Sequence, residues 1–136
     1  MTAPVFDLSD DEPTIERRWS FTIPIAVPSA NELKRAAYSG DKSRYKRLRT
    51  DFGWLVKSAA QWVPKATAPR KVRITRLMGK NGKLYDHDNF VSACKALLDE
   101  LVAFGLLVDD SAEWVTATYA QEKAKEHGTK VELEDA

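Results

Sequence analysis

Cysteine and histidine are scarce in this chain, and long apolar runs are lacking. The one cysteine, Cys94, excludes an internal disulfide framework and a cysteine-based zinc site, and the two histidines do not suit a zinc site either. No apolar run approaches the roughly 18 residues that a membrane-spanning helix needs. The acidic N-terminus lacks the basic start and apolar stretch of a secretion signal. These absences predict a soluble intracellular protein with no membrane partner.

Length and composition fit one globular domain. The 136 residues are enough for a core of their own, and 43% hydrophobic residues are ordinary for a folded protein. Residues 1–16, which include DLSDDEPTIE, have the composition of a flexible acidic arm. We therefore expect such an arm at residues 1–16 and a single folded domain at residues 17–136.

The net charge of +1 conceals a strong segregation of charge along the chain. Residues 1–16 hold five acids and no base, whereas residues 84–136 hold twelve acids and four bases. Between them, residues 17–83 hold seventeen lysines and arginines against three acids, which gives this segment a net charge of +14. A segment this basic predicts a polyanionic partner, and nucleic acid is the usual one.

The spacing of apolar residues predicts the regular elements. Strands are expected at residues 18–27, 70–78, 84–85, 113–121 and 131–133, and helices from about 43 to 62 and from 88 or 89 to 104. Pro24 favours an edge position or an early end for the first strand, and Asn81-Gly82 favours a hairpin. The order of elements predicts an α+β fold, in which two main helices pack on a mixed β-sheet.

Two acidic clusters flank the second predicted helix. The segment DHDN, residues 86–89, precedes it, and Asp109 and Asp110 follow Gly105, a natural residue for ending a helix. Asp and Asn are preferred helix caps, anions suit a helix N-terminus, and Asp-Asp-Ser can form a turn. Each cluster alone is therefore more often structural than catalytic.

One narrow stripe of this helix carries Asp88, Lys95 and Asp99, opposite its apolar face. At about 100° per residue, Lys95 and Asp99 lie within about 20° of Asp88. Two flanking acidic clusters, a lysine on the stripe and a basic segment upstream together favour Mg²⁺-dependent hydrolysis of phosphodiesters. Carboxylates bind hard cations, the metal activates water, and a lysine stabilises charge in the transition state.

The segment DHDNFVSACKALLDELVAFGLLVDD resembles the RusA family of Holliday junction resolvases. It shares with that family the Asp-x-Asp-Asn motif, a helix with Lys and Asp four residues apart, and Gly-x-x-x-Asp-Asp. The upstream segment IPIAVPSANEL is similar to the strand and Pro-Ser-x-Asn loop of the family. The resemblance covers roughly residues 19 to 120. The lysine lies about one helical turn farther from Asp-x-Asp-Asn than in the family's best-known member, on the same helix face.

The resemblance implies a RusA-like homodimer that cuts four-way DNA junctions symmetrically in recombination and repair. The cofactor would be Mg²⁺, with Mn²⁺ able to substitute. The family's metal-binding acids carry over onto Asp86, Asp88 and Asp110, with Asp109 assisting, and its essential lysine onto Lys95. Phages and prophages often encode such proteins, so we expect a cytoplasmic location in a bacterial or phage-infected host cell.

The basic segment supplies the expected DNA contacts, since contacts to phosphates dominate the affinity for DNA. The residues assigned to DNA are Lys34, Arg35, Lys42, Arg44, Lys46, Arg47, Arg73, Arg76, Lys80 and Lys83. Some of these are expected to be no more than a solvated helix face. Trp54 and Trp62 are expected in the core or at the dimer contact. Phe90 is expected in the core, and stacking on DNA bases is the less favoured alternative for it.

Two alternatives stay open, and a third, a small protein–protein adaptor that uses the acidic arm, is weaker because it leaves the segment of charge +14 unexplained. One is a nuclease with a similar site that acts on other branched DNA, such as flaps or forks. The other is a branched-DNA-binding protein that has structural acids and no catalytic activity.

Overall fold

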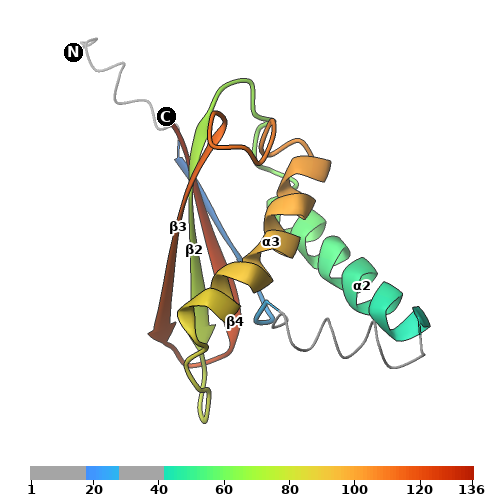
Figure 1. Cartoon of the computed structure of the whole chain (residues 1–136), viewed down its shortest axis with the longest axis vertical. Helices are drawn as coiled ribbons and strands as arrows, with labels where there is room; N and C mark the ends of the chain where they lie inside the picture. The colour runs from blue at the N-terminus through green and yellow to red at the C-terminus, as the bar shows by residue number, and fades with distance from the viewer. Residues whose placement is uncertain (1–17, 28–41) are drawn as a thin grey trace, which may run out of the picture.

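The computed structural model describes residues 18–27 and 42–136 (Figure 1). In these residues the elements are β1 (Arg18–Ile23), α2 (Lys42–Ala60), β2 (Arg70–Met78), α3 (His87–Ala103), β3 (Val115–Lys123) and β4 (Gly128–Asp135). The predicted α+β class, with a mixed sheet and two helices, is confirmed. The predicted acidic arm at residues 1–16 lies outside the described residues. No helix of the described part is long and apolar enough to cross a membrane.

The strands form one sheet in the order β1-β4-β2-β3. β4 pairs antiparallel with both β1 and β2, whereas β2 and β3 are parallel. Because parallel strands need a long crossover, α3 lies between β2 and β3 in the chain. β1 is at the edge of the sheet and ends just before Pro24, as that proline predicts.

The strand predicted at residues 84–85 does not form, and the hairpin predicted at Asn81-Gly82 is only a turn. Asn81 has a positive φ of 67°, and the Gly82 N–H donates to the Gly79 carbonyl over 2.9 Å. The chain then enters α3 directly. β2 has no free edge for a hairpin partner, because β3 and β4 already pair along its whole length.

Both helices pack against one face of the sheet (Figure 1). Side chains alternate along strands, so Val72 and Ile74 of β2 face the helices, while Lys71 and Arg73 face away. The helices contribute large buried residues to this core, among them Phe52, Val56, Phe90, Leu97 and Leu101. Phe90 is therefore a core residue, as expected.

The two tryptophans of the first predicted helix are not in the core. The exposed fractions are 63% for Trp54, on α2, and 56% for Trp62, just beyond it. The positions with core spacing on α2 are filled by smaller residues such as Val56 and Ala60, which are buried. The expectation that these tryptophans lie in the core is wrong, and the alternative expectation of a dimer contact stays a prediction.

Candidate functional site

The N-terminus of α3 explains one of its acids structurally. The helix begins at His87, one residue earlier than expected, and Asp86 is its N-cap. The Asp86 carboxylate accepts a hydrogen bond of 3.3 Å from the Asn89 N–H, and Asp88 lies in the first turn, where the helix dipole favours an anion. Asp86, His87 and Asp88 are all exposed to solvent.

A partly buried hydrogen-bond network holds the loop that precedes Asp86. The side-chain amide of Gln121, on β3, accepts from the Tyr85 N–H and donates to the Tyr85 carbonyl, each over 3.0 Å. Arg76, on β2, donates to the Lys83 carbonyl over 2.8 Å and to Gln121 over 3.1 Å. Its guanidinium also lies 3.6 Å from the centre of the Tyr85 ring. Sequence reasoning did not find this network, because Gln121 is 36 residues from Tyr85 in the chain.

Two residues of the predicted polar stripe on α3 contact each other. The Lys95 ammonium lies 3.1 Å from the Asp99 carboxylate, one turn farther along the helix. Cys94, next to Lys95 in the chain, faces the other way and is buried in the core. Burial raises the pKa of the Cys94 thiol to about 12, so it stays protonated and has no part in the site.

The end of α3 turns the chain back toward this stripe. Gly105 has a φ of 79°, and the Leu106 N–H donates to the Leu101 carbonyl over 2.8 Å, as in a Schellman motif. Leu106 and Leu107 are then buried, as expected from the sequence. Asp110 follows them and forms an ion pair with Lys95. A residue of the second acidic cluster thus contacts the middle of α3.

Arg70 fastens this returning segment to the sheet. Its side chain is only 3% exposed, donates to the Leu106 carbonyl over 2.9 Å and pairs with Asp135 at 2.9 Å. The guanidinium also lies 4.5 Å from the centre of the Trp19 ring. A buried charge needs partners of this kind, and here they fix where the chain leaves α3.

The acids are not gathered into one cluster in the described structure. Asp88 is seven residues before Lys95, which corresponds to about 10 Å along the helix axis. The described residues contain no group of three His, Cys, Asp or Glu side chains placed to hold a metal ion. A metal site shared by Asp86, Asp88, Asp109 and Asp110 therefore stays a prediction.

The charge of Lys95 is stabilised by its two partners. Hydrogen bonds to Asp110 and Asp99 raise the pKa of the Lys95 ammonium. The same hydrogen bond from Lys95 lowers the pKa of the Asp110 carboxyl. At neutral pH the contact is therefore between an ammonium and a carboxylate, on an exposed part of the surface.

The predicted DNA-contacting residues divide into three groups. Those described as exposed are Lys46, Arg47, Arg73, Lys80 and Lys83. Arg76 is 5% exposed and points inward, so its burial does not fit a DNA contact. Lys34 and Arg35, and the side chains of Lys42 and Arg44, lie outside the described part of the structure.

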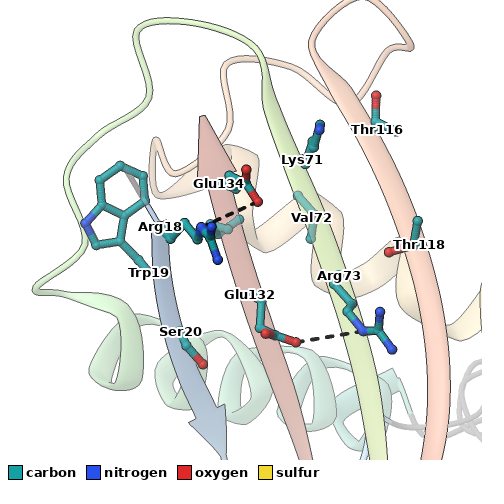
Figure 2. A pocket seen from close by; sticks show the side chains of 11 residues that line it. Arg18, Trp19, Ser20, Lys71, Val72, Arg73, Thr116, Thr118, Glu132 and Glu134 are labelled. Atoms are coloured by element: carbon teal, nitrogen blue, oxygen red, sulfur yellow. Dashed lines mark ion pairs between the residues drawn. The ribbon is translucent and has the colours of Figure 1, made fainter. Parts of the chain in front are cut away.

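A hollow lies on the face of the sheet that the helices do not cover (Figure 2). It measures about 400 Å³ and crosses all four strands. Two of its cations face acids on β4: Arg18 lies 3.9 Å from Glu134, and Arg73 lies 3.9 Å from Glu132. This pairing largely neutralises the hollow, so its chemistry does not favour an anionic ligand.

No model of a known protein family matches this chain, and no curated protein matches it. Its function is therefore inferred from the chemistry of the residues on and around α3.

Removal of the Gln121 amide tests the loop network. Gln121→Ala leaves the Tyr85 N–H and carbonyl without their partners. We expect the free energy of unfolding to fall by about 1–3 kcal/mol and the Tyr85 amide to exchange its hydrogen faster. Chemical denaturation and NMR hydrogen exchange measure both. Glu122→Ala, at an exposed neighbouring position, is the control and should change stability by less than about 0.5 kcal/mol. An unchanged Tyr85 exchange rate in Gln121→Ala would contradict the network.

The Lys95–Asp110 contact predicts a pH dependence. A carboxyl whose pKa is lowered on folding contributes stability above its unfolded pKa, near the ordinary 3.8, and loses that contribution as the pH falls through the lower folded value. Carboxyl NMR should therefore show Asp110 titrating below 3.8 in the wild type and moving up toward that value in Lys95→Met. Lys123→Met, at an exposed lysine on β3, is the control and should leave Asp110 unchanged. The same Asp110 titration in Lys95→Met and wild type would refute the contact.

Proposed function

We propose that this protein is a Mg²⁺-dependent, structure-selective endonuclease of the RusA type, which resolves four-way DNA junctions as a homodimer in recombination and repair. The observation that carries the proposal is the ion pair between Lys95 and Asp110. It joins a residue that follows α3 to the outer stripe of the helix, beside a third charged group, Asp99. The resemblance of the Asp-x-Asp-Asn and Asp-Asp segments to RusA resolvases supports the same reading.

The side chains on this stripe suit the chemistry of phosphate esters. Lys95, like an ordinary lysine, is protonated at neutral pH, and hydrogen bonds to two carboxylates raise its pKa further. An ammonium held in place in this way can stabilise the negative charge that develops on a phosphate in the transition state. Asp99 and Asp110 are positioning groups for that ammonium, since both contact it.

The metal ligands in the proposal are Asp86, Asp88 and Asp110, with Asp109 assisting. All four carboxylates are exposed, and they are hard oxygen donors of the kind that Mg²⁺ and Mn²⁺ prefer. Mg²⁺ commonly uses only one or two protein carboxylates, together with water and substrate phosphate, so a preformed group of three is not required. When bound, the metal would supply an activated water and neutralise charge on the phosphate.

The exposed lysines near the start of α3 suit a DNA substrate. Lys80 and Lys83 lie on the segment between β2 and Asp86, and Lys46 and Arg47 add positive charge on α2. Phosphate contacts of this kind hold DNA regardless of its sequence. A two-fold dimer would present two such surfaces and two sites to a four-way junction, which has matching symmetry.

The chief alternative is a branched-DNA-binding protein without catalytic activity. It is favoured by the absence of a grouped set of metal ligands among the described residues. In that case the acids would only cap and brace α3, as Asp86 does. A nuclease for flaps or forks would share the site, and a panel of branched substrates at fixed salt separates it from a resolvase.

Substitution of the proposed ligands decides between catalysis and binding alone. Asp88→Asn and Asp110→Asn should each abolish cleavage of a four-way junction while junction binding is retained or tightened, because each removes a negative charge near DNA. Gel assays of cleavage and binding measure both. Asp51→Asn, at an exposed aspartate on α2 outside the two clusters, should cleave like the wild type. Full cleavage by Asp110→Asn, or loss of its fold or binding, would count against metal catalysis.

A further inference from the structure

A charged groove lies between α2 and α3, apart from the stripe that carries Lys95 and Asp99. Its main hollow is about 360 Å³, with Arg49, Trp54 and Lys57 on the α2 side and Glu100 and Phe104 on the other. A smaller hollow of about 110 Å³ shares Lys57 and Phe104 with it and adds Lys65. The two hollows are therefore neighbours on the surface, and together they are here called the Trp54 groove.

Among the described residues, the one acid that lines the Trp54 groove, Glu100, is already paired. The Arg49 guanidinium lies 3.5 Å from the Glu100 carboxylate. Gly53 leaves space for this pair, since a Cβ atom there would lie 3.0 Å from a Glu100 carboxylate oxygen. With Glu100 paired to Arg49, the other charged residues described in the groove, Lys57 and Lys65, are both positive. The Lys65 ammonium donates to the Phe104 carbonyl, a neutral partner that leaves its charge uncompensated. The groove thus favours an anionic ligand.

The wall of the groove includes a tryptophan that the protein does not bury. Trp54 is 63% exposed, and its only described ring contact is with the Lys57 ammonium, 5.5 Å from the ring centre. Trp62 is nearly as exposed, at 56%, but its indole N–H donates to the Ala59 carbonyl and it does not line the groove. An exposed indole beside a lysine ammonium offers a flat surface on which a base can stack.

The residues around Trp54 form one stripe of α2. Arg47, Thr50, Trp54 and Lys57 are spaced three, four and three residues apart, which places them on the same helix face. All four are exposed, as is Asp51, which lies beside the stripe three residues before Trp54, so the described charges along the stripe are two bases and one acid. An aromatic platform flanked by basic residues along a line is the arrangement by which proteins bind single-stranded nucleic acid, with bases stacked on the ring and phosphates beside the cations.

We propose that the Trp54 groove binds unpaired nucleotides of DNA, with a base stacked on the Trp54 indole and neighbouring phosphates contacting Lys57 and Lys65. A base can stack on the indole only when it is unpaired, so the ligand is a single strand. Duplex DNA could use the phosphate contacts but not the stacking. This inference rests on the proposed function in one respect: the unpaired nucleotides would come from the branch point of the DNA substrate. Binding to the groove itself needs neither metal nor cleavage.

The test uses the full chain and an oligothymidine of about 12 nucleotides, in EDTA, with binding followed by fluorescence anisotropy. Trp54→Ala should weaken binding by about 5- to 150-fold, the range for loss of one stacked base, while Trp54→Phe keeps most of the affinity. Trp62→Ala is the matched control, an equally exposed tryptophan outside the groove, and should bind like the wild type. Lys57→Gln should reduce the slope of log affinity against log salt concentration by about 1, the effect of losing one phosphate contact.

Quenching of tryptophan fluorescence supplies an independent readout of stacking. Oligothymidine should quench the wild type and Trp62→Ala but not Trp54→Ala. Equal affinities for Trp54→Ala and wild type, equal losses in Trp54→Ala and Trp62→Ala, or no binding of oligothymidine by the wild type would overturn the proposal. A Trp54→Ala chain that changes from dimer to monomer would also overturn it, by identifying the groove as a contact between subunits.

The two proposals fail separately. If the protein cleaves junctions but binds oligothymidine equally with and without the Trp54 indole, the nuclease proposal stands and the groove proposal fails. A protein that binds oligothymidine through Trp54 but cleaves no branched DNA keeps the groove and loses the nuclease. Asp110→Asn, which should abolish cleavage, is expected to bind oligothymidine like the wild type, because Asp110 does not line the groove.

Discussion

Burial of the apolar face of α3 is the constraint on which the candidate site depends. Phe90, Leu97 and Leu101 are at most 1% exposed, and they fix the rotation of the helix against the sheet. With 3.6 residues per turn, that rotation leaves Lys95 and Asp99 no position except the outer stripe. The hydrophobic core thus determines where the ammonium lies, and the ammonium in turn attracts Asp110.

The central strand β2 reinforces this arrangement at both ends of α3. It carries two buried arginines, Arg70 and Arg76, six residues and about 20 Å apart on the helix-facing side of the sheet. Arg76 bonds to the Lys83 carbonyl before the helix, and Arg70 bonds to the Leu106 carbonyl after it. Each acidic cluster therefore follows a segment that is fastened to the same strand.

Much of this architecture could be predicted from local sequence patterns. Gly105 indicated the helix end, Pro24 the end of the edge strand, and helical spacing the stripe that carries Lys95 and Asp99. These predictions succeeded because each depends on backbone geometry or on periodicity within one element. The failures share a different cause, since they depend on tertiary contacts. The strand at residues 84–85 is missing because β2 has no free edge, and Trp54 is exposed because the helix-facing core is filled without it.

Only part of the candidate site could be predicted from the sequence. Asp110 and Lys95 are fifteen residues apart, and their contact depends on how tightly the chain turns after Gly105. Gln121 gave no local signal at all, because its partner Tyr85 belongs to a different part of the chain. The residue types at the two ends of α3 predicted hydrolytic chemistry, whereas the distances among the carboxylates come only from the fold.

The most direct test of the account is to incubate the wild-type protein with a labelled four-way junction, with and without Mg²⁺, beside a linear duplex of the same sequence. The account predicts paired cuts in the junction only when Mg²⁺ is present, and no cutting of the linear duplex. Tight binding of the junction without cleavage at any Mg²⁺ concentration would contradict it, and would leave the acids around α3 with a structural role alone.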